Sequence, residues 1–363
     1  MLVNVIVKFI FLELKFIDYY YTRKLIKGEK FLMKAVKILA ISILIFAFTS
    51  VSYAEKKQDS WKPDKLDAKR AIPNSITPPD KLEPENILTP LETDEGIIRR
   101  VKIPDGERVI ALTFDACELA TMTTGCDMDV INFLRINKIP ATFFMGGKWM
   151  RTHSRRVKQI LSEHELFEIA NHNWSHGNCA LLSETELKKQ ILWTQAEYEI
   201  LLDEFLHEFY DAKGFDNLEA VEELQAKIPP VPTLFRLPYG RNNEQALKII
   251  SRLGLRIIQW DVAAEAGDNS NIKRAKSSAK KVSAMTKPGS ILLFHANSVP
   301  KGTANLLQFV VEELKSNGYS FVKVSELLQA GEPETVRNGY FTKPGDNLAL
   351  DKKFGFDGTG RRK

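Results

Sequence analysis

Two histidines four residues apart, His172 and His176 in the segment NHNWSH, are the first residues in the sequence whose types and spacing could do chemistry. This spacing brings two imidazoles close enough to share one cation. The alternative is that the two histidines are packed or solvated and bind no cation, which the same spacing allows. The pair, however, directly follows a predicted strand, Phe167–Asn171, and the chain has only six histidines. We therefore interpret the pair as a candidate metal site.

Three further ionisable residues lie in or just after short apolar runs. Asp115 ends the run in LTFDACE, and His295 ends the run in ILLFH. A carboxylate or an imidazole at such a place loses solvation unless it has a partner or a function. Arg236 in FRLPYG is a candidate partner for Asp115, because guanidinium pairs well with carboxylate. The alternatives are a helix cap or structural ion pair at Asp115 and a satisfied core histidine at position 295.

Repeated strand-then-helix units are expected to position these residues, and they predict an α/β fold with a parallel sheet. The predicted strands are Val109–Phe114, Ala141–Phe144, Phe167–Asn171, Thr233–Leu237, Arg256–Trp260, Ser290–Phe294 and Ser320–Val324. The predicted helices are Asp127–Asn137, Arg151–His164, Ser183 toward Tyr210, Asn243–Leu253, Ile272–Met285 and Thr303–Ser316. Six or seven units over about 230 residues favour a barrel over a small open sheet.

The ionisable residues gather at one end of these strands. In such barrels, chemistry takes place at the carboxyl ends of the strands. Five predicted strands each place an ionisable residue at or beside that end, which we take as the strongest sign of a functional site. These residues are Asp115, His172, Arg236, Asp261 and His295.

Composition and charge exclude several classes of protein. The chain has 363 residues, of which 44% are hydrophobic and 27% charged, so it is not expected to be disordered, collagen-like or a disulfide scaffold. The formal net charge of +5 is contributed by residues 1–54, and the charges of the remaining residues cancel. A neutral body argues against a nucleic-acid partner, which requires a positive surface.

The N-terminal residues 1–54 are interpreted as an extension and a secretory signal peptide. Met33 is the expected start, Lys34 and Lys37 precede an apolar run, and cleavage is expected after Ala54. The apolar run is short for a membrane span, so no stable span is expected after processing, although an uncleaved anchor is the alternative. We expect export to the periplasm or the extracellular space.

The remaining residues are divided by composition. We expect a Pro-rich linker or arm over 55–104, a catalytic domain over 105–330 with a helical insertion at about 203–232, and a loosely held polar tail over 331–363. The insertion would form either a groove wall or a surface elaboration packed on the barrel. Of the three cysteines, Cys117 and Cys126 could pair, and three separate thiols are the equal alternative.

Five ordered motifs resemble those of the NodB-type polysaccharide deacetylases, carbohydrate esterase family four. The resemblance runs from about Val109 to Leu328. The motifs are TFD at 113–115, HNWSH at 172–176, RLPYG at 236–240, WD at 260–261 running on to Asp268, and LLFH at 292–295. The resemblance implies a distorted (β/α) barrel and removal of N-acetyl groups from an amino-sugar polymer such as peptidoglycan, an exopolysaccharide or chitin oligomers.

The resemblance also implies a role for each matched residue. Asp115 would be the catalytic base and Arg236 would orient it. The backbone N–H of Tyr239 would serve the oxyanion, and His295 would supply the acid that protonates the leaving amine. His172 and His176 would bind one divalent metal, for which zinc is our first choice. The residues expected to line the substrate pocket are Pro238, Trp260 and Leu293.

Two departures from the family pattern affect the expected site. The first motif of the family is usually TFDDG, and its second aspartate completes the metal triad, but here Ala116 stands at that position. Either a substitute oxygen ligand or a two-histidine site is expected, with Cys117 a weaker choice in an oxidising compartment. A metal-free site or an inactive protein is the third alternative. The candidate substitutes are Glu118, Asp127 and Asp129. In the fourth motif, the acid that usually supports the catalytic histidine is not at the expected distance from Trp260 in the sequence. For the acid that supports His295, Asp268 is the first choice and Glu265 the second.

Two other functions remain open on the sequence. A glycoside hydrolase with two carboxylates would use Asp115 with Glu118 or Asp261, but it would leave the histidines and Arg236 without a role. A secreted, non-catalytic carbohydrate-binding protein with a degenerate site is the stronger alternative because of Ala116. Acetate release distinguishes both from a deacetylase.

Overall fold

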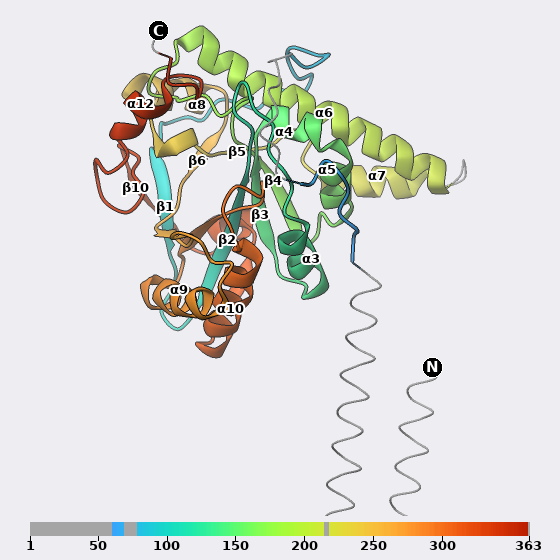
Figure 1. Cartoon of the computed structure of the whole chain (residues 1–363). Helices are drawn as coiled ribbons and strands as arrows, with labels where there is room; N and C mark the ends of the chain where they lie inside the picture. Colours follow the sequence, from blue (N-terminus) through green and yellow to red (C-terminus); the bar gives the residue numbers. More distant parts are fainter. Residues whose placement is uncertain (1–59, 69–77, 214–217, 362–363) are drawn as a thin grey trace, which may run out of the picture. The chain divides into compact units, whose positions relative to one another are not determined.

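Parallel strands form the centre of the molecule (Figure 1). The structure is a computed structural model that describes residues 60–68, 78–213 and 218–361. Contacts separate Met1–Ser60 from Trp61–Lys363, and all elements below belong to the second unit. The expected start at Met33 and the expected cleavage after Ala54 lie outside the described residues.

The strands form one sheet in the order β10-β1-β6-β5-β4-β3-β2-β8-β7, with β9 paired to β2. Neighbouring strands are parallel, except that β1 and β10 are antiparallel. An isolated bridge between Arg100 and Ser290 brings the two sides of the curled sheet together. The strands are β1 (Ile97–Lys102), β2 (Val109–Ala116), β3 (Ala141–Met145), β4 (Phe167–Asn171), β5 (Leu234–Phe235), β6 (Arg256–Ile258), β7 (Val262–Ala263), β8 (Ile291–His295), β9 (Ser320–Val322) and β10 (Glu332–Val336). This arrangement confirms the predicted α/β fold with a distorted (β/α) barrel.

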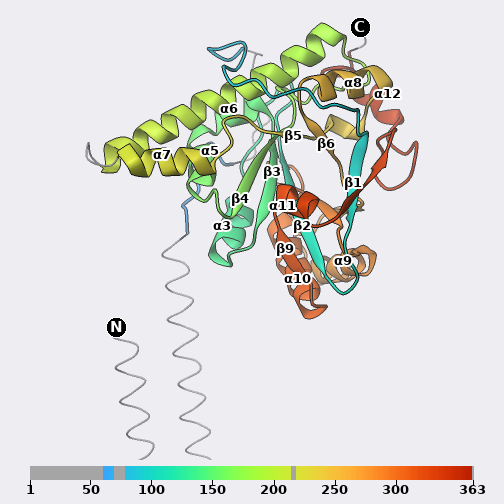
Figure 2. The same ribbon diagram turned by 180° about the vertical axis from the view of Figure 1, so that it is seen from behind.

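Helices cover the outer side of the sheet, and the longest of them, α6, contacts α4, α5, α7 and α8 (Figure 2). The helices are α3 (Met128–Ile136), α4 (Gly147–Thr152), α5 (Ser154–Ser162), α6 (Glu184–Lys213), α7 (Leu218–Lys227), α8 (Glu244–Arg252), α9 (Ile272–Met285), α10 (Thr303–Ser316), α11 (Val324–Gln329) and α12 (Ala349–Phe354), with a 3-10 turn, η1, at Pro238–Gly240. Ser183 and Glu186 form the predicted capping box at the start of α6. Within the described ranges, no helix has the length and apolar composition needed to cross a membrane.

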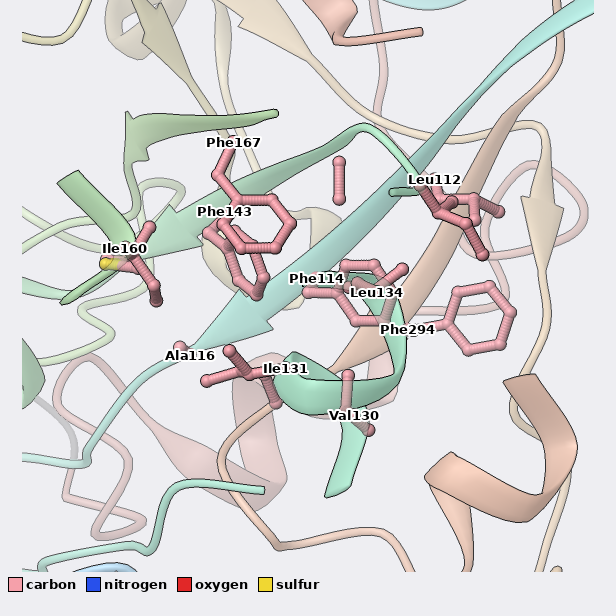
Figure 3. Packing of buried hydrophobic residues seen from close by; sticks show 14 of the residues in the cluster. Leu112, Phe114, Ala116, Val130, Ile131, Leu134, Phe143, Ile160, Phe167 and Phe294 are labelled. Atoms are coloured by element: carbon pink, nitrogen blue, oxygen red, sulfur yellow. The ribbon is translucent and has the colours of Figure 1, made fainter. Parts of the chain in front are cut away.

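The alternation of side chains along the strands decides which residues reach the functional site. In β2 the even-numbered residues from Ile110 to Ala116 pack with α3 in the main hydrophobic core, part of which Figure 3 shows. The even-numbered residues of β8 join the same core. Odd-numbered residues of both strands face the interior of the curled sheet, where Leu293 packs. Asp115 and His295 are odd-numbered, so the two strands present them on that interior side.

The expected tail over 331–363 is wrong, because most of this segment is folded onto the sheet and its loops. Strand β10 pairs with β1, and Phe341 packs against the indole of Trp260. The buried amide of Asn347 donates to the carbonyls of Tyr239, Gly240 and Gly339. The segment is rich in glycine and polar residues because it satisfies backbone groups rather than filling a hydrophobic core.

The expected arm over 55–104 is also wrong for its described part. Residues 97–102 form β1, which lies inside the sheet between β10 and β6. Earlier in the segment, Asp67 forms an ion pair with the buried guanidinium of Arg156, and Lys81 lies 2.9 Å from a carboxylate oxygen of Glu199. The charges that indicated a solvated linker therefore attach this segment to α5 and α6.

The expected helical insertion at 203–232 corresponds to the second half of α6, α7 and the segment that follows. Leu224 and Ile228 join the main hydrophobic core, and the phenol of Tyr198 on α6 donates to the carbonyl of Pro229. The insertion therefore packs on the helical layer. This agrees with the alternative of a surface elaboration packed on the barrel rather than a groove wall.

Candidate functional site

Four of the residues singled out in the sequence meet at the carboxyl ends of the parallel strands. Asp115 lies in β2, His172 follows β4, Arg236 follows β5 and His295 ends β8. Nη1 of Arg236 lies 2.7 Å from Oδ1 of Asp115, and Nε2 of His172 lies 3.5 Å from Oδ2 of the same carboxylate. The short strands β4 and β5 bring these groups together because their ends share one edge of the sheet.

Asp115 and Arg236 form a buried ion pair with several supports. The guanidinium is fully buried, also donates to the carbonyls of Ile258 and Gln259, and lies 3.8 Å from the ring centre of Phe144. Burial by itself disfavours a charged carboxyl. The charge of Arg236, with smaller contributions from His172 and His295, outweighs that effect and lowers the pKa of Asp115. The group is therefore held as a carboxylate that can accept a proton.

His172 and His176 present unpaired ring nitrogens to the same region. Nδ1 of His172 donates to the carbonyl of Arg236 at 2.9 Å, which leaves Nε2 with a free electron pair. Both Nε2 of His172 and Nδ1 of His176 are buried without a hydrogen-bond partner among the described residues. Burial lowers the pKa of both imidazoles, and each remains neutral as metal ligands must.

The backbone around the histidines is strained. His176 has a φ of 56° and Asn173 a φ of 62°, in the left-handed region that favours glycine. Two buried hydrogen bonds hold this loop: the backbone N–H of Asn173 bonds to Asn171, and its side-chain amide donates to the carbonyl of Gly177. Such strain is typical of functional sites, where the surrounding structure fixes the geometry.

Cys117 is the third group beside the two histidines. Its sulfur and one nitrogen of each of His172 and His176 all lie within 4.8 Å of one another. Ala116, at the position of the missing aspartate, points the other way into the main core. Burial, with the nearby carboxylates of Asp115 and Glu118, raises the pKa of the Cys117 thiol. Two neutral imidazoles with free electron pairs and one sulfur are a donor set that fits a divalent metal such as zinc.

The three oxygen ligands expected as substitutes do not reach the histidines. The Glu118 carboxylate is buried behind the site, where it accepts from the backbone N–H of Thr124 and the hydroxyl of Thr152, and burial raises its pKa to about 7. Asp127 caps α3 by accepting from the N–H of Val130. Asp129 is exposed in the first turn of α3. None of these three carboxylates is therefore placed to complete a site with the two histidines, and Cys117 is the group that lies beside them.

His295 has a carboxylate partner, but not the first one expected. Its Nδ1 lies 2.6 Å from Oε2 of Glu265, whose other oxygen accepts from the hydroxyl of Thr303. Asp268 is instead half-exposed and accepts from the backbone N–H of Ser270. Burial opposes a charged imidazole, but Glu265 outweighs that effect and raises the pKa of His295 above its usual value.

These residues open into a pocket of about 540 Å³ with a polar side and an apolar side. Asp115, Cys117, His176 and His295 contribute polar groups. The larger apolar residues are Leu119, Met122, Leu237, Tyr239, Trp260, Leu293, Phe341, Leu350 and Phe354. Trp260 and Leu293 were expected here. Pro238 was also expected, but in the described part of the chain it contributes no lining: it is buried at the start of η1, and its neighbours line the pocket.

The apolar wall contains residues that the sequence analysis missed. Phe354 of α12 stacks on Tyr239 with ring centres 5.1 Å apart, and Phe341 and Leu350 lie on the same side. Arg241, just after η1, forms a bidentate ion pair with Asp351. The aromatic residues of the C-terminal segment could have indicated that this segment is packed against the pocket. Its polar composition indicated a loose tail instead.

The three cysteines are free thiols in the structure, so the alternative of a Cys117–Cys126 pair is not observed. Cys126 lies in the main core with its sulfur 3.7 Å from that of Met128. Cys179 accepts from the amide of Asn173. Of the three, only Cys117 lines the pocket in the described residues.

Comparison with known proteins identifies the family of this chain. The family model described as polysaccharide deacetylase matches residues 102–209. A peptidoglycan-N-acetylglucosamine deacetylase of Listeria monocytogenes is 31% identical over 248 residues, which are 67% of this chain and 44% of that protein. The chain thus spans less than half the length of that relative. A peptidoglycan-N-acetylglucosamine deacetylase of Bacillus cereus is 31% identical over 229 residues, which are 63% of this chain and 92% of that protein.

Two solved structures are similar to this chain at lower identity. A peptidoglycan N-acetylglucosamine deacetylase in complex with a hydroxamate-type benzamide has a TM-score of 0.47 and 25% identity, covering 64% of this chain and 93% of its own. A pseudoenzyme of carbohydrate esterase family four also has a TM-score of 0.47, with 22% identity over 65% of this chain and 72% of its own. Because the Bacillus cereus relative is matched over nearly its whole length, this chain belongs to the polysaccharide deacetylase family.

Proposed function

We propose that the protein removes N-acetyl groups from an amino-sugar polymer of the cell wall, with peptidoglycan as the first candidate. The observation that carries the proposal is the meeting of Asp115, paired with Arg236, and His295, paired with Glu265, in one pocket beside His172 and His176. The relatives named above act on peptidoglycan according to their names, which supports this choice of substrate.

Asp115 is the proposed general base. The ion pair with Arg236 keeps it ionised, and the carboxylate takes a proton from the water that attacks the amide carbonyl. A divalent metal held by His172 and His176, with zinc as the expected ion, supplies Lewis-acid polarisation of that carbonyl and of water when it is bound. The backbone N–H of Tyr239, at the turn that follows β5, is the proposed donor to the oxyanion.

His295 is the proposed general acid. Glu265 raises the pKa of its imidazole and so favours the protonated form, which gives its proton to the nitrogen of the leaving amine. The C–N bond of the amide then breaks, leaving acetate and a free amino sugar. Asp115 serves the water and His295 serves the amine, so the acid and the base act on opposite sides of the scissile carbonyl.

A glycoside hydrolase is disfavoured by the positions of its candidate second carboxylates. Asp261 accepts from the hydroxyl of Ser290 and the backbone N–H of Ile291, where it holds the start of β8. Glu118 lies behind the site, as described above. In the described part of the chain neither residue lines the pocket, so neither faces Asp115 across a bound sugar.

We also propose that the protein is exported. The signal-like sequence that ends at Ala54 supports export, and so does a cell-wall substrate, which lies outside the cytoplasmic membrane. N-terminal sequencing of the protein recovered from cell fractions tests this proposal, since processing predicts a new N-terminus at Glu55.

The function is tested by incubating the protein with peptidoglycan fragments and with chitin oligomers and measuring acetyl loss by mass spectrometry. We expect loss from at least one of these glycans, and less loss after treatment with a chelator. Glycan binding by the folded protein without any acetyl loss would contradict the proposal and favour the non-catalytic alternative. Cleavage of the sugar chain would instead favour a glycoside hydrolase.

A further inference from the structure

We propose that Cys117 binds the metal through its sulfur. This chain then has a Cys-His-His site, whereas the family pattern has an Asp-His-His site. The inference deepens the proposed function, on which it rests for the presence of a metal. It assigns the third ligand to a residue that lies one position beyond the missing aspartate.

Cys117 directly follows Ala116, the last residue of β2, and this position explains why Cys117 can take this place. Side chains alternate along a strand, so residues 115 and 117 face the same side and residue 116 faces the other. Ala116 accordingly packs in the main core, whereas Asp115 and Cys117 both line the pocket. The cysteine sulfur and the two histidine nitrogens come within 4.8 Å of one another, as ligands around one ion do.

The histidines provide the independent sign that a ligand belongs here. His172 is 1% exposed, and its Nε2 is buried without a hydrogen bond among the described residues. Leaving such a group unpaired costs free energy unless something else binds it. The bond from Nδ1 of His172 to the Arg236 carbonyl fixes the ring so that Nε2 keeps its electron pair, an arrangement typical of metal-binding histidines.

The surroundings of Cys117 suit a ligand sulfur. The side-chain amide of Asn297 donates to the Cys117 carbonyl at 3.1 Å and lies 3.6 Å from its sulfur, so one side chain holds both groups. Burial favours the neutral thiol in the absence of a cation, and a bound dication favours the thiolate instead. The nearest carboxylate, Asp115, is engaged by Arg236 and is the base, which leaves the sulfur as the third donor.

A thiolate changes which metals the site prefers. Sulfur ligands favour zinc and cobalt over magnesium and manganese, which prefer oxygen. We therefore expect zinc to be retained in the presence of a large excess of magnesium.

The test is the absorption spectrum of chelator-treated protein titrated with cobalt(II). Thiolate bound to cobalt gives a charge-transfer band in the near ultraviolet, which imidazole and oxygen ligands do not give. We expect this band in the unaltered protein, saturating at one cobalt per chain. The variant Cys117→Ser should lose the band and bind zinc at least about 100-fold more weakly, since even residues that only support ligands cost about 10–100-fold.

Cys126→Ala is the matched control, because it removes a buried thiol from the core and leaves the pocket unchanged. It should keep the band, and thermal melting verifies that both variants fold. Cobalt binding by the unaltered protein without the band would overturn the proposal, as would no cobalt binding at all. Acetyl loss is measured separately: if it persists while the band is absent, the ligand assignment fails and the proposed function stands.

Discussion

The two sides of the pocket are built in different ways. The polar side consists of strand ends, where Asp115, His172 and His295 come from the central sheet and each has a fixed partner. The apolar side includes Phe341, Leu350 and Phe354, which come from the C-terminal segment. From the proposed function we infer a division of work, in which the sheet provides the catalytic groups and the C-terminal segment contacts the substrate.

The two sides also differ in what stabilises them. A network of buried charges supports the polar side, and removing one member leaves its partner buried and unpaired. The C-terminal segment depends on backbone groups satisfied by Asn347 and on the stack of Phe354 on Tyr239. Substitutions on the two sides should therefore affect different kinetic parameters.

The largest effect is expected for Asp115→Asn. The amide cannot accept a proton from water, so kcat should fall by about 100-fold to 10,000-fold while KM changes little. The buried guanidinium of Arg236 also loses its counter-charge, so the free energy of unfolding should fall by about 3–5 kcal/mol. Kinetics of acetate release and denaturant unfolding measure the two effects. An unchanged kcat in the folded variant would remove Asp115 from the role of base.

A change in pH dependence is expected for Glu265→Gln. The rate should rise with pH as Asp115 loses its proton and fall as His295 loses its own, which gives a bell-shaped profile. The lowered pKa of Asp115 places the acid limb at low pH, and the raised pKa of His295 places the alkaline limb at high pH. Glutamine removes the charge that raises the His295 pKa, so the alkaline limb should move to lower pH.

The acid limb is the internal control for this variant, because Glu265 does not contact Asp115. A profile that moves at both limbs, or at neither, would argue against Glu265 as the residue that positions and charges His295.

The smallest effect is expected for Phe354→Ala, which removes part of the apolar wall. Loss of one aromatic contact should raise KM for a sugar oligomer by about 10-fold with kcat nearly unchanged, because the contact is equal in the bound substrate and in the transition state. Leu348→Ala is the matched control: this residue lies in the same segment, is 57% exposed and does not line the pocket. It should leave both parameters unchanged. A lower kcat in Phe354→Ala would give the C-terminal segment a part in the chemistry.

Much of the polar side could be predicted from the sequence. Alternation and apolar runs place Asp115, Arg236 and His295 at strand ends, and parallel strands bring those ends together. The same alternation places residue 117 beside residue 115, but the expectation of an oxidising compartment favoured oxygen ligands over Cys117. For the partner of His295, the two-residue strand β7 has no usable periodicity, so the sequence could not decide between Glu265 and Asp268.

The apolar side could not be predicted in this way. Glycine and charged residues are frequent in residues 331–363, and such a composition is typical of solvated segments. Its burial depends on individual hydrogen bonds, such as those from Asn347 to the carbonyls of Tyr239 and Gly240, which lie more than 100 residues away in the sequence. No local pattern in the sequence predicts a hydrogen bond between a side chain and a distant backbone carbonyl.

The division of work is tested most directly by measuring kcat and KM for acetate release from one N-acetylglucosamine oligomer, with the unaltered protein, Asp115→Asn and Phe354→Ala in the same assay. We predict that the unaltered protein releases acetate, that Asp115→Asn lowers kcat and that Phe354→Ala raises KM. No acetate from the unaltered protein, or the same parameter changed by both substitutions, would contradict the account.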